Sequence, residues 1–247
     1  MALHFNKLAL VGALSASLLA ACGGGGGGYT APTTPPAVES TSSFALSAGY
    51  KARIVNGATD NFNITGDAGD PNGCEGTASI KTEPAAVFTF EGVAGHSSAQ
   101  TSTVNFTKNC LPPTKTVTGK TFYNNSYVPI GQSIDGGDYS KFQAPPADLP
   151  AMVKVNDTGS IATLNTFTDS TATVATGKRV LSYEIKADTS TTVLTNIITR
   201  TYDAANNLLV TQTSSYRTVV DGSLTLVSID VQFSFNSKIH LIYTPPK

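Results

Sequence analysis

The feature that most constrains this chain is a series of short runs in which apolar and polar residues alternate, bounded by Gly, Asn, Asp or Pro. A period of two places one set of side chains in a core and the other in water when the run forms a β-strand. Beyond residue 43 no stretch keeps an apolar period of 3.6, and Pro150 interrupts the longest helix candidate, around residues 147–153. These patterns predict an all-β protein of antiparallel sheets, as a sandwich or a partly open barrel, with little helix.

The alternation is clearest in the C-terminal part of the chain. Leu181, Tyr183, Ile185 and Ala187 are expected to face one side of a strand, with Ser182, Glu184 and Lys186 on the other. The strands expected next form a β-meander of residues 193–202, 208–220, 223–235 and 239–243, joined at 203–207, 221–222 and 236–237. The Asp221-Gly222 pair predicts a tight two-residue hairpin with positive φ at both positions.

The strand expected at residues 223–235 changes phase along its length. Leu224 and Leu226 share one phase, whereas Ile229 and Val231 share the other. This shift predicts a β-bulge near Val227, or a strand that passes from one packing layer to another.

The first half of the chain is expected to form strands at residues 44–55, 87–91, 101–108 and 116–127. A Pro-rich connector at residues 143–150 is the best internal boundary. It divides an N-terminal β region (residues 44–143) from a C-terminal meander region (residues 151–247), and leaves open whether these are two domains or two sheets.

The N-terminus carries an export signal: Lys7 precedes an apolar run over residues 8–21 that is shorter than a spanning helix needs. The sequence Leu19-Ala20-Ala21-Cys22 at its end resembles the lipobox of bacterial lipoproteins. The resemblance implies a signal peptide at residues 1–21 and a lipid on Cys22, which becomes the first residue. It also implies that Gly23 permits sorting to the outer membrane, so the expected partner is the membrane, through this lipid anchor.

A tether is expected between Cys22 and the β-strands. Residues 22–43 are rich in Gly, Thr, Pro and Ser and cannot build a core. At about 3.3–3.6 Å per residue this segment reaches roughly 70 Å when extended.

Cys74 and Cys110 are the cysteines that remain once Cys22 carries lipid. An even pair in an exported protein predicts a disulfide, since export routes are oxidising. A metal or redox pair needs His or Cys neighbours that the sequence does not supply.

The densest group of aromatic and amide residues is a candidate surface for sugars or a protein partner, because rings offer apolar area and amides offer hydrogen bonds. Its members are Tyr123, Asn124, Asn125, Tyr127, Tyr139 and Phe142. Tyr is also common in β-strands, so these residues can equally have a purely structural role.

Residues 95–99 approach the G-x-S-x-G nucleophile elbow, and Ser97 with an acid and His240 follows the chain order of that hydrolase class. An elbow leads into a helix, however, and the residues that follow are β-like, so a surface turn is expected here. His96 and His240 are the two histidines beyond the signal, too few for a multi-histidine metal site within one chain.

Three further segments are expected to be turns. Residues 67–73 lack the acidic first and last ligands of a calcium loop, and Asp135 and Asp138 flank a Gly-Gly pair. Residues 201–209 resemble a single YD-type repeat of large bacterial shell proteins, with Asn206 where that family has Gly. One copy predicts a hairpin with the same turn chemistry.

Composition narrows the function further. With 40% hydrophobic and 13% charged residues and a net charge of −1, the chain builds a core and gives no electrostatic case for nucleic acid. We expect a lipid-anchored envelope protein with a non-enzymatic interaction or structural β-module, no cofactor, and an envelope protein or a glycan as partner. The alternative is a small-ligand or glycan binder, and a serine hydrolase comes third. A deep pocket near residues 123–142 favours ligand binding, whereas a flat face favours protein contact.

Overall fold

The computed structural model describes residues 39–68, 73–108, 114–234 and 239–246, which form one antiparallel sheet and one helix. The helix is α2 (Leu46–Asn56). The strands are β1 (Ala58–Ala68), β2 (Cys74–Thr82), β3 (Ala86–Phe90), β4 (Val93–Lys108), β5 (Thr114–Asn124), β6 (Pro129–Ile134), β7 (Tyr139–Phe142), β8 (Thr158–Phe167), β9 (Ala175–Ala187), β10 (Thr192–Asp203), β11 (Leu208–Val219), β12 (Leu224–Phe233) and β13 (Ile239–Thr244). In these ranges no helix is long and apolar enough to cross a membrane.

The sheet closes on itself through β4, which is 16 residues long and pairs with three strands. Its first part pairs with β3 and its second part with β2, while its other edge pairs with β5. The β2–β4 pairing joins the two ends of the sheet into a 12-stranded barrel, and β3 is an extra strand beside it. The predicted all-β antiparallel fold is confirmed, and the barrel is fully closed.

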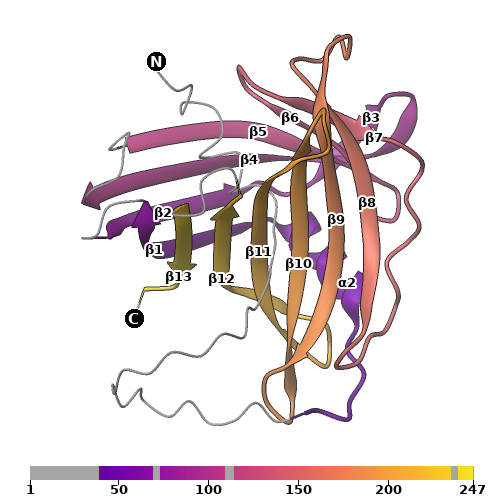
Figure 1. Cartoon of the computed structure of the whole chain (residues 1–247). Coiled ribbons are helices and arrows are strands. Elements are labelled where there is room, and N and C mark those ends of the chain that lie inside the picture. Colours follow the sequence, from indigo (N-terminus) through magenta and orange to yellow (C-terminus); the bar gives the residue numbers. More distant parts are fainter. Residues whose placement is uncertain (1–38, 69–72, 109–113, 235–238, 247) are drawn as a thin grey trace.

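The barrel has two sides that cross at a steep angle, with β1, β2, β4 and β5 on one side and β8–β11 on the other (Figure 1). One apolar cluster comes from β1, β2, β4 and β11–β13, and includes Phe62, Ile229 and Tyr243. A second cluster comes mainly from β8–β10 and includes Leu181 and Ile185. The predicted alternation in β9 is confirmed, because Leu181, Tyr183 and Ile185 are buried and the residues between them are not.

Helix α2 packs inside one end of the barrel, where Phe44 and Leu46 are fully buried in the second cluster. Phe44 also forms an isolated antiparallel bridge with Val153. The predicted strand at residues 44–55 is therefore wrong. The buried Leu46 and Ile54 are eight residues apart, which is a helical spacing that Gly49 between them obscures in the sequence.

The predicted bulge in β12 is confirmed. Ser215 of β11 pairs with Ser228, and the next residue, Tyr216, pairs with Leu226. Val227 therefore has no partner residue on β11, and the extra residue turns both halves of β12 toward the core.

The predicted meander is confirmed as β10–β13, but the turn at Asp221-Gly222 is longer than expected. The Val219 amide donates to the Ser223 carbonyl, and the Gly222 amide donates to the Val219 carbonyl. Within this turn only Gly222 has a positive φ, of 92°. The predicted two-residue geometry with positive φ at both positions is wrong, because one more residue enters the loop.

The hairpin expected at residues 203–207 is confirmed. The Asp203 carboxylate accepts hydrogen bonds from the amides of Ala205 and Asn207. Asn206 has a φ of 63°, a value that Gly adopts most easily and Asn tolerates.

The connector at residues 143–150 does not separate two sheets, because β7 and β8 on its two sides pair with each other. Cys22 and residues 23–38 of the expected tether lie outside the described residues. Cys110 does too, so the disulfide stays a prediction. Cys74 is buried at the start of β2, and the adjacent Glu75 pairs with Lys108, two residues before Cys110 in the sequence.

Gly222 allows a close contact between the β11–β12 turn and α2, so we predict that Gly222→Val is strongly destabilising. A Cβ on Gly222 would lie 2.4 Å from the Ala45 carbonyl oxygen, and the valine would also need a positive φ. Each effect costs about 1–3 kcal/mol. Gly136→Val is the matched control, because Gly136 has a φ of 67° with nothing near its Cβ position.

Urea denaturation of the variants measures this difference. Asp221→Asn is expected to be mild, since an Asn oxygen can also accept the Ser223 amide. Equal losses for Gly222→Val and Gly136→Val contradict the close packing of this turn on α2.

Candidate functional site

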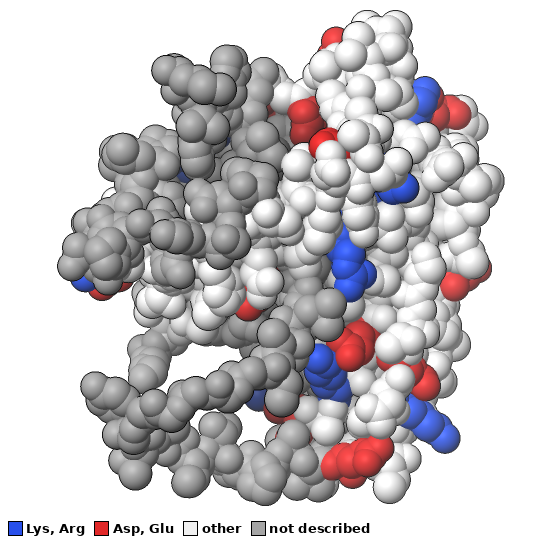
Figure 2. Space-filling view, in the orientation of Figure 1, with Lys and Arg blue, Asp and Glu red and all other residues white. Residues whose placement is uncertain are grey.

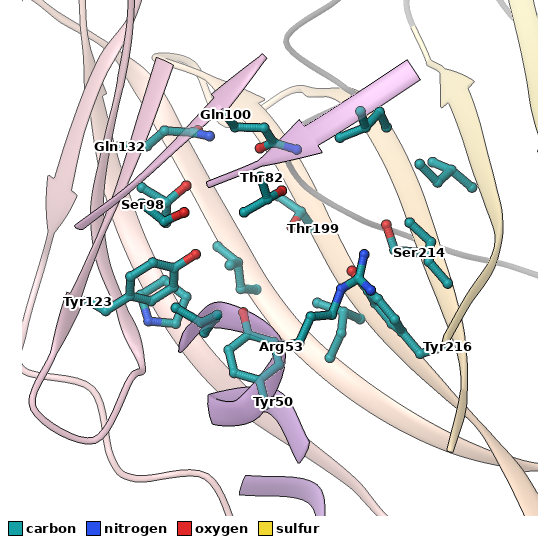
Figure 3. Close-up of a pocket in the computed structure, with 18 of the residues that line it drawn as sticks. Tyr50, Arg53, Thr82, Ser98, Gln100, Tyr123, Gln132, Thr199, Ser214 and Tyr216 are labelled. Atoms are coloured by element: carbon teal, nitrogen blue, oxygen red, sulfur yellow. The ribbon is translucent and has the colours of Figure 1, made fainter. Parts of the chain in front are cut away.

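The interior of the barrel holds a cavity of about 130 Å³ between the two apolar clusters. Helix α2 and ten of the twelve barrel strands contribute to its wall. Side chains from opposite sides of the barrel converge on this space in Figure 3. An engineered cavity of about 150 Å³ binds benzene, whereas pockets for drug-sized ligands measure about 300–1,000 Å³. The space therefore suits a molecule of only a few heavy atoms.

Helix α2 supplies one end of the cavity wall through Tyr50 and Arg53, which point into the space (Figure 3). Arg53 forms a short ion pair with Asp60 of β1, and its guanidinium lies 5.1 Å from the ring centre of Tyr216. Burial opposes the charge on Arg53, but Tyr216 and Asp60 outweigh it and raise the pKa of this group. Arg53 is thus a fixed, neutralised cation.

Arg179 of β9 supplies a second cation in the wall, and only 1% of it is exposed. Its Nη1 donates to Oε1 of Gln132, and its Nη2 lies 3.4 Å from a carboxylate oxygen of Asp138. Its Nε is buried and has no hydrogen-bond partner among the described residues. Burial lowers the pKa of Arg179, with Asp138 acting in the opposite direction. A guanidinium nevertheless stays protonated in proteins, so the cavity holds a real charge.

Most of the remaining polar wall is neutral. Burial raises the pKa of Tyr50, Tyr123 and Tyr216, so these phenols stay protonated at neutral pH. Further hydroxyl and amide groups come from Thr82, Ser98, Gln100, Thr121, Gln132, Thr199 and Ser214. This wall offers many hydrogen-bond donors and acceptors, which suits a polar ligand.

The predicted aromatic and amide group does not form one exposed surface. Tyr123 lines the cavity, while Tyr127 is buried and stacks on His96 with ring centres 4.4 Å apart. Tyr139 is buried and donates a 2.7 Å hydrogen bond to Glu91.

The other three members of this group have structural or solvent-facing positions. Asn124 accepts the amides of Ser126 and Val128 through its side-chain oxygen, which shapes the β5–β6 turn. Asn125 is exposed, and Phe142 is partly buried against the apolar clusters. Within the candidate group, Tyr123 alone belongs to the cavity wall.

The elbow-like segment at residues 95–99 lies inside β4, so the surface turn expected there is wrong. The strand that was expected to begin after this segment begins before it, at Val93. His96 contacts the Tyr127 hydroxyl at 3.2 Å, and His240 contacts Asp230 at 3.0 Å. Ser97 and His240 lie on β4 and β13, with β2 and β1 between them in the sheet.

The turn expected at Asp135 and Asp138 is confirmed, because the Ile134 amide donates to the Asp138 carbonyl. Residues 69–72 of the other Asp-Gly turn lie outside the described residues. In the part of the chain that the structure describes, no group of three or more His, Cys, Asp or Glu residues is placed to hold a metal ion.

The charged residues of the cavity were not predicted from the sequence. Arg179 has the same phase as Leu181, so the alternation in β9 contains the signal that places it inside. Arg53 and Asp60 carry no such signal, because α2 was expected to be a strand and the pair joins two different elements.

Comparison with protein-family models, with characterised proteins and with solved structures finds no match to this chain.

The Arg53–Asp60 pair fixes α2 to the barrel wall, and we predict that Asp60→Asn destabilises the protein by about 1.5–3 kcal/mol. That is the usual range for a hydrogen bond to a charged group, and the substitution leaves Arg53 without its counter-ion. Glu83→Gln is the matched control, since Glu83 pairs with Lys81 where both side chains are about half exposed.

Exposed pairs contribute about 0–1 kcal/mol. Urea denaturation at neutral pH compares the two variants with the wild type. Equal effects of Asp60→Asn and Glu83→Gln contradict the anchoring role of the interior pair.

Proposed function

We propose that this protein is a lipid-anchored envelope protein whose barrel binds a small polar ligand, without catalysing a reaction on it. The polar cavity inside the closed barrel, with Arg53 and Arg179 in its wall, is the observation that carries this proposal. The lipobox-like sequence ending at Cys22 supports the anchor.

Ligand binding is favoured over a surface interaction module by where the aromatic residues lie. Tyr123, Tyr127 and Tyr139 are buried, so they do not present a flat aromatic face to a partner protein. Tyr123 contributes instead to the wall of the interior cavity, the arrangement that favours a ligand.

The side chains on the outer face of the barrel favour attachment to the membrane through the lipid on Cys22. Closed antiparallel barrels occur in outer-membrane proteins, where an apolar band surrounds the strands. On β9 the outward positions include Lys178, Glu184 and Lys186 beside Val180, while Leu181, Tyr183 and Ile185 face the interior. Acidic and basic side chains are scattered over the part of the face in Figure 2 that belongs to the described residues. We infer that the barrel lies in water and that the lipid on Cys22 connects it to the outer membrane.

We predict that Cys22→Ser abolishes acylation, because the thiol is the lipid acceptor and a hydroxyl is a far poorer nucleophile. Mass spectrometry and fractionation of the envelope measure the lipid and the attachment. Gly23→Ala is the control and is expected to keep the lipid. Lipid found on the Cys22→Ser variant contradicts the proposed anchor.

Native mass spectrometry of the full acylated protein, purified from envelopes in mild detergent, tests whether a ligand is bound. Leu181→Phe fills the cavity from β9, and Val180→Phe places the same ring on the outward face of the same strand. We expect a small molecule that co-purifies with the wild type and with Val180→Phe but is lost from Leu181→Phe. A wild-type protein without such a molecule, or equal retention by both variants, contradicts ligand binding in the barrel.

A further inference from the structure

Arg179 lines the cavity and has a hydrogen-bond donor that no described residue uses. Gln132 takes Nη1, and the contact of Nη2 with Asp138 is long, at 3.4 Å. Nε has no partner within the described ranges although it is fully buried. A buried N–H of a charged group is costly to leave unsatisfied, so this edge of the guanidinium needs an acceptor.

Nε and Nη2 together form the side-on fork of a guanidinium, which matches the two oxygens of a carboxylate. The same chain uses this fork at Arg217, where Nε and Nη2 lie 2.7 and 3.2 Å from the two carboxylate oxygens of Asp188. Arg179 is a residue of the cavity wall, and no carboxylate of the described residues bridges its Nε and Nη2 in this way.

The charge of the wall favours a monoanion. The charged residues that line the cavity are Arg53, Arg179 and Asp60. Arg53 and Asp60 neutralise each other, which leaves Arg179 in excess. Asp138 compensates Arg179 only partly, because its side chain is 39% exposed and its contact is long.

The rest of the wall near Arg179 favours an organic anion. Leu164 pairs with Arg179 across β8 and β9, and Leu181 follows two residues along the same face. Leu164, Leu181 and Ile197 all line the cavity. These apolar side chains suit a short hydrocarbon chain and contribute no hydrogen bonds to an inorganic ion.

We propose that the cavity is a binding site for a small organic monocarboxylate, held side-on by Nε and Nη2 of Arg179 with its hydrocarbon part against Leu164, Leu181 and Ile197. This inference rests on the proposed function and names the ligand class of the same site. The volume of about 130 Å³ limits the ligand to about the size of benzene, which a four-carbon acid matches.

The test uses isothermal titration calorimetry on the full acylated protein in detergent, after exhaustive dialysis. Butyrate, its neutral analogue butyramide, and inorganic phosphate are the three probes. The variants are Arg179→Lys, which keeps the charge and removes the planar fork, and Arg217→Lys, which makes the same change at the outer-surface pair with Asp188.

We expect butyrate to bind the wild type at least about tenfold more tightly than butyramide, since the charged fork contacts only the acid. Arg179→Lys is expected to lose at least about tenfold in butyrate affinity, and Arg217→Lys to bind as the wild type does. The comparison of butyrate with butyramide needs no variant, so it stands even if Arg179→Lys does not fold.

Four outcomes overturn this inference. They are equal binding of butyrate and butyramide, phosphate binding without butyrate binding, unchanged butyrate affinity in folded Arg179→Lys, and no binding of any of the three probes. If the wild type still carries a co-purifying molecule that Leu181→Phe loses, the proposed function survives and only the ligand class is wrong. If that molecule is absent as well, both fail.

Discussion

The pairing of β2 with β4 is the constraint on which the rest of the structure depends. Without it the sheet has two edges and its concave face is open to water; with it every barrel strand is paired on both sides. Closure sets the cost of placing a charge inside, because a guanidinium away from water needs hydrogen-bond partners. The interior contacts of Arg53 with Asp60 and of Arg179 with Gln132 follow from this requirement. Twelve strands also make a barrel wider than the eight-stranded kind that side chains just fill, which leaves room inside for α2 and the cavity.

The cavity depends equally on α2, which fills one end of the barrel and carries three of the wall residues, Tyr50, Arg53 and Ile54. The helix is held by its apolar residues in the second cluster, by the Phe44–Val153 bridge and by the contact of Gly49 with Gly222. Packing and electrostatics thus act on the same element. A change that displaces α2 alters the shape and the charge of the cavity together.

Local patterns in the sequence predict local structure well. The alternation in β9, the bulge at Val227 and the C-terminal meander follow from side-chain periodicity, which records which face of a strand is buried. The closure of the barrel does not follow from it, because β2 and β4 read the same whether or not they pair. The cavity has features of both kinds. The phase of β9 predicts that Arg179 lies inside, but nothing in the sequence predicts that Gln132 of β6 and Asp138 of the β6–β7 turn contact it. Pairings between distant elements leave no periodic trace.

The two ends of the barrel differ, because the N-terminal segment attaches at only one of them. Ser40 hydrogen-bonds the Ser190 carbonyl in the β9–β10 turn, and Phe44 then bridges to Val153, so the N-terminal segment enters at the end that α2 fills. Anything that pulls on the N-terminus acts first on these contacts and on the helix behind them. The β10–β11 turn at Asp203 and Asn207 lies at the opposite end of these strands. A force on the N-terminal segment therefore acts on the end of the barrel that contains α2, and reaches the other end only through the strands.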